Sequence, residues 1–154
     1  MNKPVSIRRA AVNDAAPITR LAAELGYATH AETMRHRLEA ILASAADLLI
    51  VAVDSSNAVV GWLQARVAHI VESGFRAEIV GLIVAPMSRR RGIGRALVLA
   101  AEDWAREMSA EAIVVRSNFK RAESQAFYPA LGYATTKTQV VYRKPFKAEI
   151  AGTE

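Results

Sequence analysis

The chain contains no cysteine among its 154 residues. This absence excludes disulfide bonds, thiolate metal ligands and a cysteine nucleophile together, and it gives no sign of an oxidising compartment. Apolar runs are also short: the run at 48–53 spans about six residues, whereas a membrane-spanning helix requires roughly 20. The opening residues lack the apolar segment of a secretory leader. We therefore expect a cytoplasmic protein that does not cross a membrane.

The composition is that of a folded globular protein. Hydrophobic residues make up 52% of the chain and charged residues 23%, which is unlike a disordered segment. A chain of this length fits one domain, and no repeat, low-complexity run or linker interrupts it. We expect a single domain over residues 1–144, followed by a flexible tail at 145–154.

Hydrophobic periodicity and turn residues predict the order of the secondary-structure elements. Helices are predicted at 14–25, with Asn13 or Asp14 as the N-cap, and at 31–42, 92–108 and 122–131. Strands are predicted at 5–9, 48–53, 59–67, 77–84, 112–116 and 133–143, with a loop at 68–75. This order predicts an α/β (α+β) fold with a mixed, mostly antiparallel central β-sheet and helices on both faces.

Positive charge is concentrated in one short segment. The chain has a net charge of +5, and Arg89, Arg90, Arg91 and Arg95 lie within seven consecutive positions. Such a balance is compatible with nucleic acid, anionic lipid or a phosphorylated cofactor. A nucleic-acid-binding module predicts aromatic side chains interleaved with the arginines, and residues 85–96 contain none. We therefore expect no nucleic-acid partner.

The segment AEIVGLIVAPMSRRRGIGRAL at 77–97 predicts a site for a diphosphate. A buried strand is followed by a short turn and then by RRRGIG, which opens an amphipathic helix. Gly92 and Gly94 remove side chains near the backbone, the first helical amides lack carbonyl partners, and the helix dipole adds positive potential. Neighbouring arginines add charge-assisted donors. The alternative is that Arg89–Arg91 form a solvent-exposed surface run and that the glycines form an ordinary turn without a ligand.

Two other phosphate-binding patterns do not fit this segment. A P-loop requires GKS or GKT, which is missing, and a dinucleotide-binding fingerprint requires a further glycine beyond the single G-x-G pair present here. The segment instead resembles the phosphate motif of the GNAT superfamily of N-acetyltransferases, Gln/Arg-x-x-Gly-x-Gly/Ala, which Arg89, Gly92 and Gly94 match. A second segment, NFKRAESQAFYPALGY at 118–133, is similar to that family's Asn…Phe-Tyr-x-x-x-Gly-Phe/Tyr segment. The resemblance covers about residues 5–143.

The resemblance implies that acetyl-CoA is the cosubstrate, and we expect no metal. It implies that the backbone of Leu82, Ile83 and Val84 pairs with the pantetheine arm and that Asn118 contacts the same arm. It also implies that the pyrophosphate is held by backbone amides of Arg89, Arg90, Arg91, Gly92, Ile93, Gly94 and Arg95.

The resemblance further implies a general acid at Tyr128 and a general base at Glu78. An alkylamine, with a pKa near ~10.4, must lose a proton before it attacks a thioester, and a thiol of pKa ~8.5 departs more readily with help from an acid. Strand alternation predicts that Glu78 shares a face with Leu82 and Val84. The alternatives are a salt-bridge role for Glu78, a core tyrosine at Tyr128 and a turn cap at Asn118. Gln125 departs from a His common in related sequences.

The acceptor is expected to be an amine that attacks directly in a ternary complex, since no Ser-His-Asp set or cysteine nucleophile is present. A small-molecule amine is slightly favoured over a protein amine. A non-catalytic acyl-CoA sensor is the alternative function, and a homodimer is expected by analogy. His30, His36 and His69 are too scattered to predict a metal site. Candidate acceptor-lining residues are Tyr27, His30, Glu32, Glu72, Arg76 and Tyr133.

Overall fold

The computed structural model describes residues 4–117 and 122–148. These residues fall into two compact units, one running up to Val115 and the other beginning at Arg116. Within the described ranges, every helix is too short or too polar to span a bilayer.

A five-stranded sheet forms the centre of the first unit. Its strands are β1 (Val5–Arg9), β2 (Asp47–Asp54), β3 (Val59–Ile70), β4 (Gly74–Val84) and β5 (Ala112–Val115). They lie side by side in sequence order, and only the pairing of β4 with β5 is parallel. The prediction of a mixed, mostly antiparallel sheet is confirmed.

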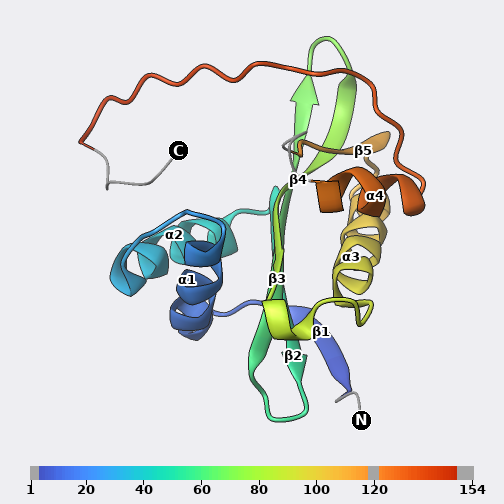
Figure 1. Cartoon of the computed structure of the whole chain (residues 1–154). Helices are drawn as coiled ribbons and strands as arrows, with labels where there is room; N and C mark the ends of the chain where they lie inside the picture. The colour runs from blue at the N-terminus through green and yellow to red at the C-terminus, as the bar shows by residue number, and fades with distance from the viewer. Residues whose placement is uncertain (1–3, 118–121, 149–154) are drawn as a thin grey trace. The chain divides into compact units, whose positions relative to one another are not determined.

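Helices cover both faces of this sheet (Figure 1). Helices α1 (Ala15–Glu24) and α2 (Ala31–Ala43) lie on one face, and α3 (Ile93–Glu107) lies on the other. Short 3-10 turns, η1 (Val12–Asp14) and η2 (Pro86–Ser88), precede α1 and α3. The predicted arrangement of helices is therefore confirmed.

Strand β2 lies in the middle of the core. All six side chains of its segment 48–53 are buried. Leu49 and Val51 pack with Ile18 of α1 and Leu38 of α2 in one apolar cluster. A strand buried on both faces must be covered by a layer on each side, since exposing one such side chain costs about 1.5–3 kcal/mol. This requirement explains the three-layered first unit.

The predicted loop at 68–75 is wrong, because most of it forms a hairpin. Strand β3 continues to Ile70 and β4 begins at Gly74, so the connection is only residues 71–73. Gly74 has a φ of +81°, a left-handed conformation that glycine adopts easily. The rings of His69 and Phe75, directly opposite each other, have centroids 4.5 Å apart. Sequence alternation is weak here because the hairpin is solvated.

The predicted strand at 133–143 is also wrong. Residues 133–148 contain neither helix nor strand in the described structure. Val140, Val141 and Tyr142 are 75%, 82% and 90% exposed. Alternating, β-branched sequence favours an extended chain, but a strand exists only where a neighbouring backbone completes its hydrogen bonds.

The second unit contains α4 (Ala122–Ala130). The helix ends at Ala130, close to the end that Gly132 led us to predict. After it, the amides of Leu131 and Gly132 donate to the carbonyls of Tyr128 and Pro129 at 3.0 Å each. Gly132 then adopts a φ of +93°. This is the left-handed glycine termination common at helix ends.

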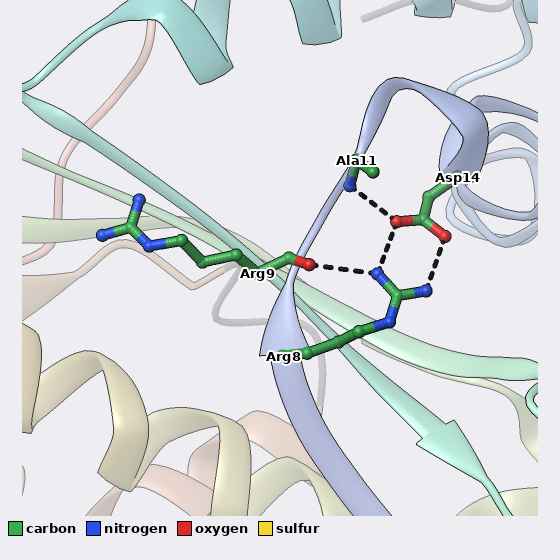
Figure 2. Close-up of polar contacts among 4 residues, drawn as sticks. All are labelled: Arg8, Arg9, Ala11 and Asp14. Carbon is green, nitrogen blue, oxygen red and sulfur yellow. Dashed lines mark hydrogen bonds and ion pairs between the residues drawn. The ribbon is translucent and has the colours of Figure 1, made fainter.

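A partly buried ion pair joins β1 to the start of α1 (Figure 2). The Arg8 guanidinium donates to both carboxylate oxygens of Asp14, at 2.8 and 2.9 Å, and the Ala11 amide donates to the same carboxylate at 2.7 Å. Asp14 occupies the predicted N-cap position, but its carboxylate does not accept from the first amides of α1. It accepts instead from Arg8 and Ala11, which precede it in the sequence. The hydrogen bonds from Arg8 lower the pKa of Asp14 despite its burial.

We predict that Asp14→Asn lowers the free energy of unfolding by about 1–3 kcal/mol at pH 7, because it removes the charge from a buried carboxylate that is bound by the partly exposed Arg8. A carboxylate whose pKa is lowered in the folded state stabilises the fold above its unfolded pKa of about 3.9, and this contribution disappears as pH falls through the folded pKa. Urea unfolding should therefore show a gap between wild type and variant that closes in acid. Asp103→Asn, in the exposed pair with Arg106, should stay within about 0.5 kcal/mol. A gap that persists unchanged in acid would contradict the assignment.

Candidate functional site

The connection from β4 to α3 is anchored at both ends. At its start, the Arg89 side chain returns to the strand, where Nε donates to the Val84 carbonyl oxygen at 3.1 Å. The Ser88 amide closes the η2 turn by binding the Ala85 carbonyl at 2.8 Å. At its end, Ile93 is only 3% exposed. The intervening backbone is therefore held in place between two fixed points.

Two residues of this connection have left-handed backbone conformations. Arg90 has a φ of +61° and Gly92 a φ of +76°. An added Cβ at Gly92 would meet no protein atom within 4 Å, so within the chain itself the left-handed φ is what favours glycine. An arginine in this conformation is uncommon, and such strained residues cluster at ligand sites.

The N-terminus of α3 presents backbone donors. The first helical hydrogen bond described runs from the Ala96 amide to the Gly92 carbonyl at 3.0 Å, and no side chain caps the helix. The amides of Ile93, Gly94 and Arg95 therefore precede the helical ladder. The helix dipole and the exposed Arg90 and Arg95 side chains add positive potential. Such a set of donors is of the kind that binds phosphate groups at helix N-termini, and the diphosphate site itself stays a prediction.

One edge of β4 is open beside this helix end. Strand β5 pairs only with residues 76–79 of β4, so no described strand covers residues 80–84 on that side. The Ala85 amide binds the Val60 carbonyl, and hydrogen-bonding pairs alternate along antiparallel strands. Leu82 and Val84 therefore direct their N–H and C=O groups towards the open edge, whereas Ile83 directs its groups towards β3.

A bulge in β4 reverses the predicted facing of Glu78. Along β3, Gln64 pairs with Gly81 and Ala65 pairs with Ile79, so Val80 is an extra residue without a partner on β3. One extra residue switches the side-chain alternation. Glu78 therefore lies on the face opposite to Leu82 and Val84, and the prediction that the three share a face is wrong.

Glu78 shares its face with Trp62, which packs against the cluster under α1 and α2. The carboxylate residue is half-buried, with Arg66 directly across on β3 and Val114 beside it on β5. Trp62 crosses Gly81, where an added Cβ would lie 2.7 Å from ring atom Cζ3. Glycine at 81 thus allows the indole to lie over the strand next to the bulge.

Tyr128 belongs to the second unit and lies on α4. It is half-buried, and its ring makes edge contacts with Phe127 and Tyr133, with centroids 4.9 and 5.7 Å away. Burial raises the pKa of the Tyr128 hydroxyl, so the phenol keeps its proton through and beyond the neutral range. Asn118 lies outside the described residues.

Two features of the site escaped sequence reasoning. The bond from Arg89 to the Val84 carbonyl has no sequence signal, whereas Gly81 within an apolar strand is a signal of a bulge or a close approach. Among the described residues, no three His, Asp or Glu side chains are grouped so as to hold a metal ion.

Comparison with known proteins identifies the family. The model of the "Acetyltransferase (GNAT) family" matches residues 15–133. The aminoglycoside N(6')-acetyltransferase type 1 of Stenotrophomonas maltophilia is 27% identical over 146 residues, which cover 92% of this chain and 94% of that protein. The protein of the same name from Klebsiella aerogenes is 29% identical over 100 residues, or 63% of this chain and 66% of its own. This chain belongs to the GNAT acetyltransferase family.

Solved structures share the fold. An aminoglycoside N-acetyltransferase, AAC(6')-Iy, crystallised with CoA, has a TM-score of 0.83 at 20% identity, covering 94% of this chain and 97% of its own. A transcriptional regulator from Bacillus halodurans has a TM-score of 0.81 at 22% identity, covering 92% and 100%. The predicted family and fold class are both confirmed.

We predict that Gly92→Asp weakens CoA binding on the order of tenfold or more relative to Gly92→Asn. Both side chains tolerate a left-handed backbone, but only the aspartate places a negative charge where a diphosphate is expected to lie. Isothermal titration with CoA measures the affinities, and thermal unfolding should shift equally in both variants. Equal CoA affinities for the two variants would show that the diphosphate does not bind at this loop.

Proposed function

We propose that this chain is an acetyl-CoA-dependent N-acetyltransferase that acetylates a primary amine of a small molecule by direct attack in a ternary complex. The observation that carries the proposal is the anchored loop between β4 and α3, with its uncapped helical amides and surrounding arginines. It lies within the part of the chain that matches the GNAT family.

Acetyl-CoA, when bound, supplies the acetyl group as a thioester. The residues proposed to hold it are those of the predicted site: the loop amides from Arg90 to Arg95, the β4 edge and Asn118. The amide of Arg89 already contacts the Pro86 carbonyl at 3.4 Å, so we assign it a lesser part. The open edge at Leu82 and Val84 supports backbone pairing with an extended amide-bearing arm.

Two side chains of this protein are proposed to move protons. Glu78 would accept a proton from the acceptor ammonium, directly or through water, so that the resulting free amine attacks the thioester carbonyl and forms the new C–N bond. Tyr128 would donate its phenolic proton to the sulfur as the C–S bond breaks. A phenol is protonated at neutral pH and is therefore available as an acid, and burial, which raises the pKa of Tyr128, makes it a weaker acid than a solvated tyrosine.

The acceptor class is proposed from the relatives, which are named aminoglycoside N(6')-acetyltransferases. Aminoglycosides are therefore the first small-molecule amines to test. The candidate acceptor-lining residues carry both signs of charge, with Glu32 and Glu72 against Arg76, so charge alone does not select a polycation. Local sequence similarity does not transfer substrate identity.

An amine panel tests the proposal. Purified protein should release CoA thiol from acetyl-CoA in the presence of at least one small amine, with aminoglycosides, polyamines and peptide amines as separate sets. Mass spectrometry should find a product heavier by one acetyl group. Thermal stabilisation by acetyl-CoA without turnover on any set would favour the alternative of a non-catalytic acyl-CoA sensor.

We predict that Glu78→Gln and Tyr128→Phe change the pH profile of turnover in different ways. Loss of the base should lower turnover at neutral pH, with partial recovery in alkali as the free amine becomes abundant. Loss of the acid should lower turnover by about 10²-fold across the profile, with CoA affinity changed far less. Gln125→Ala serves as a control on α4. A constant ratio of Glu78→Gln to wild type at every pH would reject the base role.

We also propose that the protein is a cytoplasmic homodimer and that residues 1–144 act as one catalytic domain. Exposed apolar side chains at Val140, Val141, Tyr142 and Phe146, the last 93% exposed, support self-association because large exposed apolar groups favour burial. The family match at 15–133 supports the domain bounds. Sedimentation velocity would report a monomer if the dimer is wrong, and cell fractionation tests the location.

A further inference from the structure

We propose that Arg89 is a positioning residue whose Nε–H group, rather than its charge, fixes the end of the β4 edge on which the acyl-carrying arm lies. The inference rests on the proposed function, and it gives Arg89 a task different from phosphate binding. It starts from one contact, the hydrogen bond of 3.1 Å from Arg89 Nε to the Val84 carbonyl oxygen.

The carbonyl that Arg89 binds belongs to the open edge of β4. The Ala85 amide binds Val60 on β3, so the preceding residue, Val84, directs its own carbonyl away from β3. With that acceptor engaged by Arg89, the edge offers the N–H and C=O groups of Leu82 and the N–H group of Val84. An extended amide-bearing arm then has one register in which its donors and acceptors match the edge.

The same contact links this edge to the loop between β4 and α3, residues 85–92, which is proposed to bind the diphosphate. Arg89 immediately precedes the left-handed Arg90, and the loop ends at the buried Ile93. A shift of the Arg89 side chain would release one of the two anchors of the loop and free the Val84 carbonyl at once. The diphosphate and the acyl-carrying arm would then lose their fixed spacing, and spacing at the reacting carbon affects rate strongly.

The donor atom distinguishes this role from an electrostatic one. Nε of arginine is bonded to Cδ, and so is Nε2 of glutamine, whereas the lysine ammonium lies one atom further out. Glutamine therefore keeps an N–H at the required place without a charge, and lysine keeps the charge without that N–H.

Three variants separate the two roles: Arg89→Gln, Arg89→Lys and Arg89→Met. Arg90→Gln is the matched reference for loss of charge in the same loop, and Arg37→Gln on the exposed side of α2 is the control outside the site. The measurements are kcat with acetyl-CoA and an accepted amine, Kd for CoA by titration, and amide hydrogen exchange of residues 85–92 without any ligand.

If Arg89 positions the edge, Arg89→Gln should match Arg90→Gln in kcat and Kd and keep wild-type exchange in 85–92. Arg89→Lys and Arg89→Met should lose about threefold to tenfold in kcat, the size of one net hydrogen bond. Both should exchange faster in the loop, and Arg89→Lys should keep its Kd within about threefold. Arg37→Gln should match wild type throughout.

The opposite order overturns the inference: Arg89→Lys equal to wild type and Arg89→Gln as poor as Arg89→Met would show that charge is what matters. Indistinguishable variants would overturn it as well. Failure of the proposed function looks different, because wild type itself would then neither bind CoA nor release thiol. The exchange measurement would still decide whether the Arg89 donor anchors the loop.

Discussion

The structure depends on the burial of residues 48–53 of β2 on both faces of the sheet. Because Leu48 to Val53 leave no side chain in solvent, the sheet needs a layer on each face, and α3 must return across the sheet after β4. The chain therefore has to reverse direction at 85–92, next to the end of β4. The helix N-terminus and the open strand edge are brought together by this packing requirement, so the candidate cofactor site is a consequence of core formation.

Most of the first unit could be predicted from the sequence, for identifiable reasons. Strand β1, helices α1 and α2, and the long α3 follow strong periodicity with clear ends, and RRRGIG at 89–94 predicted an anion site where uncapped amides now lie. The remaining differences concern pairing. Whether 68–75 forms a hairpin, or 133–143 forms a strand, depends on a neighbouring backbone that local sequence does not encode.

The predicted site residues also divide into those set by local sequence and those set by strand pairing. Gly92 and Ile93 lie at the start of α3, where the sequence predicted that this helix begins, and their part in cofactor binding stays a prediction. The face of Glu78 was not predictable by alternation, since the extra residue Val80 reverses it. The bulge places the half-buried side chain of Glu78 on the α1 and α2 side of the sheet, whereas the backbone groups of Leu82 and Val84 lie at the open edge of β4. A strand without the bulge would place Glu78 on the α3 side of the sheet.

The contact between Trp62 and Gly81 has an evolutionary consequence. The indole occupies the volume that any side chain at 81 would need, since a Cβ there would lie 2.7 Å from the ring. The two positions should therefore covary among homologues: larger residues at 81 should occur only with smaller ones at 62. To move the large side chain from position 62 to position 81, a lineage would pass through an intermediate with either a steric clash or a cavity. The combination of tryptophan at 62 and glycine at 81 should therefore be conserved together.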